Sequence, residues 1–127
     1  MTGRPTSITL VGTVAVPATD QERSLAFYTD TLGFATVRDV PFGPGQRWIE
    51  VAPSGGGTTI AIPPLGDATV GIDTGIRLTT DDAAGDHAAL RGAGVDVDAD
   101  ILRFPGEPPM FSLRDPDGNT LYVVERM

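Results

Sequence analysis

The stretch that decides the fold is Ser54-Gly-Gly-Gly-Thr-Thr-Ile-Ala-Ile62, because it has a counterpart 61 positions later, Asp115-Pro-Asp-Gly-Asn-Thr-Leu-Tyr-Val123. In both copies a glycine-containing turn leads into a short run of residues that favour strands, and Gly57 corresponds to Gly118. Two copies are too few to stack as a solenoid. The repeat therefore predicts one small module written twice, with pseudo-twofold symmetry and a cleft between the halves.

The spacing of 61 extends along the chain, since it also separates Asp20 from Asp81 and Gly33 from Gly94. Between these markers the hydrophobic pattern predicts the same order of elements in each copy. The first copy is expected to hold a strand at 11–16, a helix at 23–31 and strands at 34–40, 47–51 and 58–62. The second is expected to hold a strand at 75–80, a helix at 82–91 and strands at 95–97, 110–113 and 120–124.

These elements predict an α+β fold of two tandem βαβββ modules that form a cupped mixed sheet around a cleft. Module one is expected at about 8–63, a linker rich in proline and glycine at about 64–73, and module two at about 74–127. The length of 127 residues suits a single domain. Thr19 and Glu22 have the spacing of a capping box, which predicts a helix start after Thr19, and Gly33 is placed to end that helix.

Composition excludes several classes of function. The net charge is −8 and all nine basic residues are arginines, so phosphate-backbone binding and lysine Schiff-base chemistry are disfavoured. The chain has no cysteine, and no apolar run approaches the ~20 residues of a membrane span. Residues 1–7 lack the pattern of a secretory signal. We expect a cytoplasmic protein with a short N-terminal lead and no membrane or nucleic-acid partner.

Strand alternation predicts which side chains face the cleft. A buried, unpaired Glu50 would be costly, so Trp48 and Glu50 are expected on the cleft face of their strand. The same alternation turns Arg77, Thr79 and Tyr122 away from the helices.

The candidate ligand-binding residues are aromatic, apolar and charged side chains, the composition of a small-molecule pocket. They are Trp48, Tyr122, Phe42, Glu50, Arg47, Arg77, Phe104, Met110, Phe111 and Thr13, with Arg103 as a further polar anchor. Met110 and Phe111 lie in a predicted strand, where core packing is the alternative role. Phe42 and Phe104 lie in loops rich in proline and glycine, and the 104–110 loop is expected to be stiff and to shape the entrance.

Two stretches, Asp20–Phe34 and Arg114–Asn119, resemble the hallmark segments of the vicinal oxygen chelate superfamily. That family includes glyoxalase I, bleomycin-resistance proteins and extradiol dioxygenases. The resemblance spans nearly the whole chain and implies the βαβββ order given above.

The resemblance also implies where a catalytic metal would bind, because members with metal chemistry hold it with His and Glu at four strand positions. In this sequence those positions are Thr13, Ala61, Gly75 (or Thr74) and Tyr122. None is His or Glu, and neutral oxygens are weak ligands for divalent ions. We therefore expect no metal and no cofactor. The single histidine, His87, is expected to be a solvated residue of the second helix.

The sequence favours a metal-free protein that binds and sequesters a hydrophobic or aromatic compound such as an antibiotic, and that forms a homodimer. The acidic balance favours a neutral or cationic ligand. One alternative is an enzyme of the same superfamily: a metal-dependent lyase, isomerase or dioxygenase with other ligands, or a metal-free isomerase or cyclase that uses Glu50, Tyr122 or Arg77. Another is a protein interaction module without a small-molecule ligand. The cleft could be formed within one chain or across a dimer.

Overall fold

The computed structural model describes residues 5–127, so the first part of the predicted N-terminal lead, residues 1–4, lies outside the described residues. Every predicted element is present, and its ends differ from the prediction by at most two residues. Module one contains β1 (Thr13–Ala15), α1 (Gln21–Ala26), the π-helix η1 (Phe27–Thr31), β2 (Ala35–Pro41), β3 (Arg47–Ala52) and β4 (Thr59–Ala61). Module two contains β5 (Asp73–Thr80), α2 (Ala83–Gly92), β6 (Asp96–Val97), β7 (Met110–Arg114) and β8 (Thr120–Glu125).

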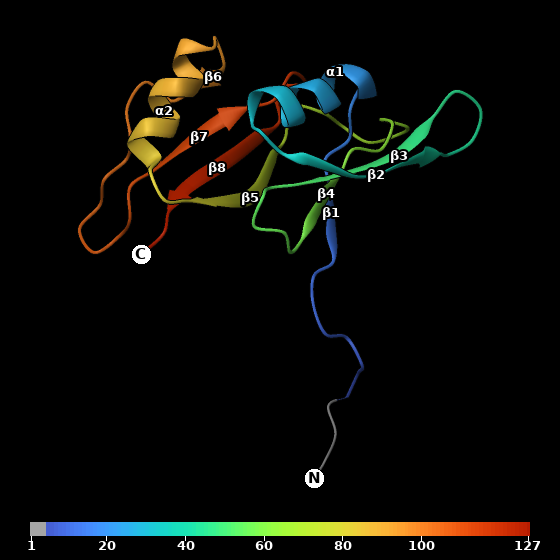
Figure 1. The fold of residues 1–127 in the computed structure, drawn as a ribbon, viewed down its shortest axis with the longest axis horizontal. Coiled ribbons are helices and arrows are strands. Elements are labelled where there is room, and N and C mark those ends of the chain that lie inside the picture. Colours follow the sequence, from blue (N-terminus) through green and yellow to red (C-terminus); the bar gives the residue numbers. More distant parts are fainter. Residues whose placement is uncertain (1–4) are drawn as a thin grey trace.

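Each module has its own four-stranded mixed sheet, and the two sheets have the same topology. The strand orders are β1-β4-β3-β2 and β5-β8-β7-β6, in which the first pair is parallel and the others are antiparallel. The helices α1 and α2 lie on the same side of the two sheets, and β1 and β5 lie near the middle of the molecule (Figure 1). The predicted α+β fold of two repeated modules is confirmed.

The first helix begins differently from the prediction. Asp20, not Thr19, is the N-cap, and its side chain accepts a hydrogen bond of 3.1 Å from the backbone N–H of Arg23. The Thr19 hydroxyl instead donates to Asp117 of module two, so the expected capping box is wrong. The end of the helix is as predicted, because Gly33 follows η1 with a φ of 78°, a conformation that glycine adopts without steric cost.

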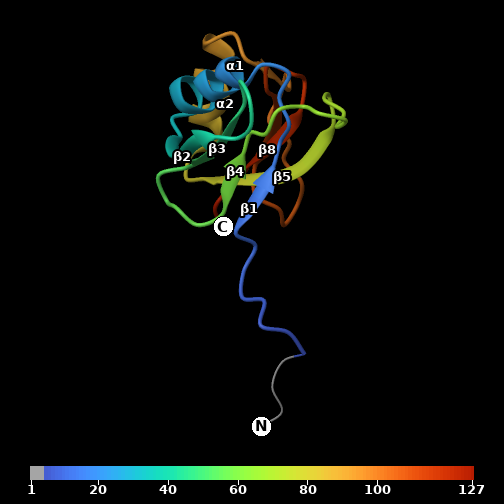
Figure 2. The same cartoon turned by 90° about the vertical axis from the view of Figure 1, so that its right-hand side faces the viewer.

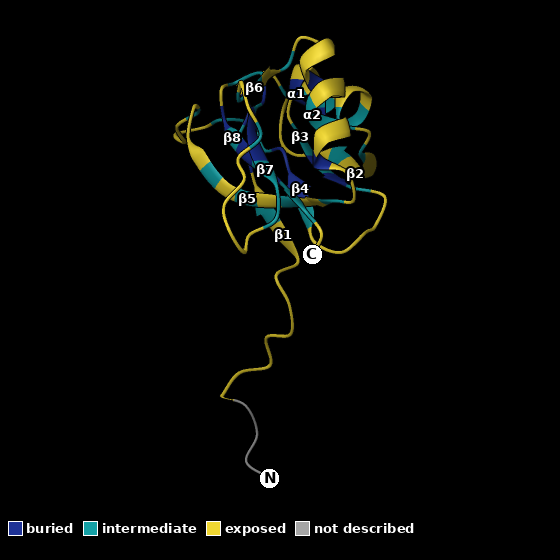
Figure 3. Ribbon diagram, turned by 90° about the vertical axis from the view of Figure 1, so that its left-hand side faces the viewer, coloured by how far each residue is buried: buried dark blue, intermediate teal, exposed yellow. Residues whose placement is uncertain are grey.

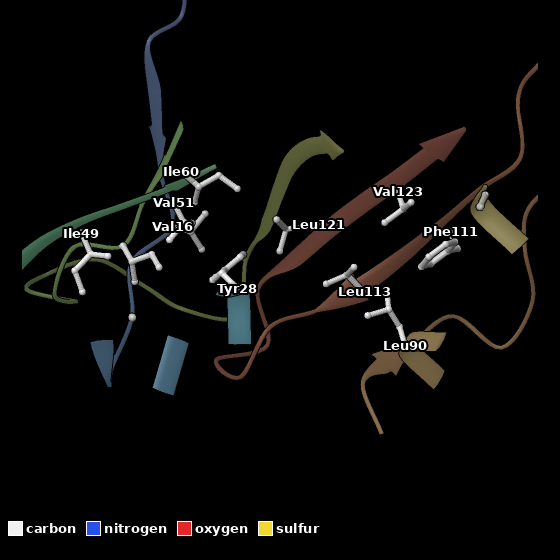
Figure 4. Close-up of a cluster of buried hydrophobic side chains, with 13 residues drawn as sticks. Val16, Tyr28, Ile49, Val51, Ile60, Leu90, Phe111, Leu113, Leu121 and Val123 are labelled. Atoms are coloured by element: carbon white, nitrogen blue, oxygen red, sulfur yellow. The ribbon is translucent and has the colours of Figure 1, made fainter. Parts of the chain in front are cut away.

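A single hydrophobic core runs between the helices and the sheets of both modules. Alternate strand residues point into it, as expected for sheets covered on one face. Tyr28 of η1 is fully buried and lies between the side chains of the two modules (Figure 4). The fully buried core members include Ile49, Val51, Ile62, Phe111, Leu113 and Leu121. Buried residues lie between the helices and the strands, and the exposed ones lie on the outer faces (Figure 3).

The segment 5–12 projects away from the body of the molecule (Figure 2). It joins module one through backbone atoms near its end, where the N–H of Thr59 donates to the carbonyl of Gly12 at 3.0 Å. Ile8, Leu10 and Val11 in this segment are largely exposed. Within residues 5–127, no helix has the length and apolar character required to cross a bilayer.

Candidate functional site

Each sheet has one face packed against the core and one face turned away from the helices, which we call its open face. In β3, Ile49 and Val51 are fully buried, whereas Trp48 and Glu50 are half-buried on the open face. The register places Glu50 beside Ala61 of β4, and Arg38 of β2 on its other side. The predicted direction of these side chains is confirmed.

Glu50 is held by two neutral donors on the open face of module one. The indole Nε1 of Trp48 donates to Oε2 at 2.7 Å, and the hydroxyl of Thr59 donates to Oε1 at 2.7 Å. These hydrogen bonds, the one from Trp48 first, lower the pKa of Glu50. The carboxylate is therefore ionised at neutral pH.

Phe42 completes this group of side chains. It follows β2 at the start of the turn to β3, and its ring packs against the Trp48 indole with the centroids 5.7 Å apart and the planes at 57°. Phe42 is 51% exposed, a large exposure for an aromatic side chain. Phe42, Trp48 and Glu50, which we call the acidic aromatic cluster, form a surface with two ring faces and one fixed charge.

The open face of module two carries a second polar arrangement, centred on Tyr122 of β8. The Tyr122 hydroxyl donates to Asp73 at 2.6 Å, and the guanidinium of Arg77 lies 4.4 Å from the centre of the Tyr122 ring. The hydrogen bond to Asp73 raises the pKa of Tyr122 and lowers that of Asp73. Arg77 reaches this position because the parallel register of β5 and β8 pairs it with Tyr122. β5 is irregular between Asp73 and Arg77, where Gly75 has a φ of 70°.

Asp98 is a polar residue of this face that the sequence did not single out. It lies just beyond β6 and accepts hydrogen bonds from the backbone N–H and the hydroxyl of Ser112, each at 2.8 Å, and from Arg114 at 3.1 Å. Burial alone would raise the pKa of Asp98, but the bonds from Ser112 and Arg114 together lower it. Asp98 and Ser112 are 14 positions apart, so no local pattern could indicate the pair.

Two predicted site residues lie elsewhere. Arg47 is on the helix side of β3, where it pairs with Asp39 at 2.7 Å and with Glu22 of α1. Phe111 is fully buried in the core and packs edge-on against His87, with ring centroids 5.1 Å apart. Neither lies on an open face, because strand alternation turns both toward the helices.

His87 is half-buried, which corrects the expectation of a solvated histidine. Its Nε2 lies 2.7 Å from the backbone carbonyl of Asp98, so this nitrogen is the donor. This hydrogen bond connects α2 to the segment that follows β6, so the role of His87 is structural.

The remaining candidates are more dispersed. Phe104 is 54% exposed in the loop before β7, Arg103 beside it is exposed, and Met110 is half-buried at the start of β7. Thr13 is exposed on β1 and its hydroxyl donates to the carbonyl of Thr59. The structure thus brings Phe42, Trp48 and Glu50 together in one module, and Arg77 and Tyr122 together in the other.

Two hollows lie along the junction of the modules. One of about 800 Å³ runs beside β5 and is lined by Val14, Ile60, Arg77 and the turn between β3 and β4. A smaller one of about 280 Å³ lies between the end of η1 and the middle of α2, and is lined by Leu32, Ala89 and Leu90 among others. Trp48, Glu50 and Tyr122 line neither hollow. These three open-face side chains therefore lie outside both hollows.

The positions where the superfamily's enzymes hold a metal do not fit a divalent ion here. Ala61 and Gly75 have no side-chain donor, and the hydroxyls of Thr13 and Tyr122 already donate to Thr59 and Asp73. Over the described range 5–127, no group of three or more His, Cys, Asp or Glu side chains is arranged to hold a metal.

Comparisons with known proteins agree with the fold. Residues 10–123 match the model of the Glyoxalase/Bleomycin resistance protein/Dioxygenase superfamily. The chain is 31% identical over 123 residues to the uncharacterized protein YetH of Bacillus subtilis (strain 168), an alignment that covers 91% of this chain and 97% of YetH.

Two solved structures are similar over almost their full lengths. TnmS3, an antibiotic binding protein from Streptomyces sp. CB03234, is 32% identical with a TM-score of 0.84, and the match covers 96% of this chain and 99% of TnmS3. A superfamily member from Sphaerobacter thermophilus DSM 20745 is 31% identical with a TM-score of 0.85, and the match covers 94% of this chain and 98% of that one.

Proposed function

The chain belongs to the Glyoxalase/Bleomycin resistance protein/Dioxygenase superfamily, and on this premise we propose that it binds and sequesters a small hydrophobic or aromatic compound such as an antibiotic. The observation that carries the proposal is the acidic aromatic cluster, in which Phe42 and Trp48 present ring faces beside a fixed carboxylate. The similarity to TnmS3 supports the same class of ligand.

The arrangement suits binding by stacking. Exposed aromatic side chains lose contact with water when a flat ligand covers them, and each aromatic pair adds about 0.5–1.5 kcal/mol beyond the area buried. The hydrogen bonds from Trp48 and Thr59 fix the orientation of Glu50 before any ligand arrives. A preordered surface loses little entropy on binding, which favours retention of the ligand.

The proposed site is completed by a second copy of the chain. Two open faces on one chain offer two half-sites, and a homodimer in which an open face of module one meets one of module two would enclose a ligand between them. Light scattering after gel filtration should give twice the chain mass, and a monomer at all concentrations would contradict the dimer.

The test of binding uses the only tryptophan of the chain, Trp48, as an internal reporter. Titration with flat anthraquinone compounds and with bleomycin should change its fluorescence at saturable concentrations, and the same compounds should raise the melting temperature. Phe42→Ala should weaken binding. Val37→Ala, which shortens an exposed side chain on the neighbouring strand β2, is the control and should not. Absence of both signals across the panel would contradict the proposal.

The competing function is an isomerase or cyclase that transfers protons through Glu50 or Tyr122. A general base or acid works best with a pKa near the working pH. Here hydrogen bonds lower the pKa of Glu50 and raise the pKa of Tyr122, so both move away from neutrality. Mass spectrometry of a bound compound after long incubation distinguishes the two functions: sequestration returns it unchanged, whereas an enzyme returns a product whose formation stops in Glu50→Gln.

A further inference from the structure

We propose that the acidic aromatic cluster is a subsite for a positively charged amine carried by the aromatic ligand. The inference rests on the proposed function and adds a positive charge to the description of the ligand. It is carried by the surroundings of Glu50, which combine two aromatic side chains with a carboxylate that forms no ion pair within residues 5–127.

The hydrogen-bond partners of Glu50 leave its charge intact. Both donors, the indole of Trp48 and the hydroxyl of Thr59, are neutral, and each occupies one carboxylate oxygen. An ionised carboxylate offers about four acceptor sites, so each oxygen can accept a further hydrogen bond. The two bonds therefore orient the carboxylate and leave acceptor capacity for a ligand.

Arg38 is the basic residue beside Glu50 by strand register, and its positive charge acts on the carboxylate without forming an ion pair with it. The register of β2 and β3 puts the two residues side by side on the open face. Yet Arg38 is exposed, and the ion pairs formed by the described part of the chain do not include one between Arg38 and Glu50. The contrast with Arg47 is direct, because Arg47 on the opposite face of β3 pairs with two acids.

The aromatic partners add to the selectivity for a cation. A cation within ~6 Å of the centre of an aromatic ring is attracted by the negative ring face, and tryptophan is the strongest such partner. The indole of Trp48 lies next to the carboxylate and packs against the ring of Phe42, so an ammonium group bound to an oxygen of Glu50 is within reach of an aromatic ring. The net charge of −8 adds a long-range attraction for cations.

The open face of module two carries charges of both signs beside its aromatic group. Arg77 lies over the ring of Tyr122, and Asp73 accepts a hydrogen bond from the Tyr122 hydroxyl. Because the guanidinium of Arg77 already occupies this ring face, the amine of the ligand is expected at module one.

The experiment compares daunorubicin, an anthraquinone with a charged amino sugar, with its N-acetyl derivative, which keeps the shape and loses the charge. Isothermal titration should show the amine bound about tenfold more tightly, which corresponds to ~1.4 kcal/mol. Glu50→Gln should remove this preference and leave the affinity of the acetylated compound unchanged within about twofold. Arg38→Gln should increase the preference, because it removes a competing cation.

Asp39→Asn is the matched control. It removes one negative charge from the residue next to Arg38, but on the helix side, where Asp39 pairs with Arg47. Asp39→Asn and Glu50→Gln each remove one negative charge from the protein, but only Glu50→Gln removes the charge beside Trp48. The preference for the amine should therefore be unchanged in Asp39→Asn.

The outcomes separate the two proposals. If both compounds bind equally, or if Glu50→Gln weakens both to the same extent, the amine subsite is wrong and the binding function stands. If neither compound binds, the amine subsite is overturned for this ligand class, and the wider panel decides the binding function by itself. Should Glu50→Gln not fold, an unchanged preference in Arg38→Gln would still contradict the inference.

Discussion

The hydroxyl of Tyr28 donates a 3.0 Å hydrogen bond to Asp115, a residue 87 positions later in the chain. This bond joins the first module's helical segment to the turn that precedes β8. Asp115 is itself fixed, because its carboxylate also accepts from the backbone N–H groups of Asp117 and Asn119. Burial, and then the charge of Asp115, raises the pKa of Tyr28, so the phenol stays protonated and remains the donor.

Tyr28→Phe should lower the free energy of unfolding by about 1.5–3 kcal/mol, the usual range for a hydrogen bond to a charged group. Urea denaturation measures the change. Tyr122→Phe is the control, since it removes a hydroxyl that also donates to an aspartate, but at an exposed site. Equal losses in the two variants would contradict a special role for the buried bond.

Gly33→Ala should destabilise the protein by about 1–2 kcal/mol, because the residue has a φ of 78° and a side chain there is strained. A Cβ at this position would meet no atom within 4 Å, so the cost is purely conformational. Gly55→Ala is the comparison, because Gly55 also has open space but lacks a positive φ. Thermal melts of both variants would reveal a loss confined to Gly33→Ala.

The contribution of ionised Asp98 to the free energy of unfolding should be lost in acid. Its pKa is lowered in the folded state, so its contribution is present above the unfolded pKa of about 3.9 and disappears as the pH falls through the lower folded value. Asp98→Asn should therefore be less stable than the native protein near pH 7, and the difference should shrink toward pH 3. A difference that stays constant over this range would show that the charge of Asp98 does not contribute.

Arg47→Gln should leave ligand affinity unchanged, because Arg47 lies on the helix side of β3 and pairs with Asp39 and Glu22. Its side chain is 35% exposed, so the loss of stability should stay within about 1 kcal/mol. Trp48→Leu, on the open face of the same strand, should abolish binding of the same compound. Titration calorimetry of the two variants tests the assignment of the faces, and weaker binding by Arg47→Gln would contradict it.

Local patterns in the sequence predicted most of the fold. The repeat of 61 residues gave two modules in the same order, and Gly33 marked the end of the first helix. Period-two alternation placed Trp48, Glu50 and Tyr122 on the open faces, because successive side chains of a strand point to opposite sides. The same rule places Arg47 and Phe111 on the helix side, but their charge and aromatic character suggested ligand contacts instead.

Tertiary structure decided the features that depend on distant partners. Thr19 was expected to cap a helix, and instead it bonds to Asp117, which is 98 positions away. Asp98 meets Ser112 only because β7 returns beside β6, and Tyr28 meets Asp115 only because the modules pack together. A sequence therefore determines secondary structure and the face of a strand through short-range sterics, whereas the pairing of polar groups is decided by how the two sheets meet in space.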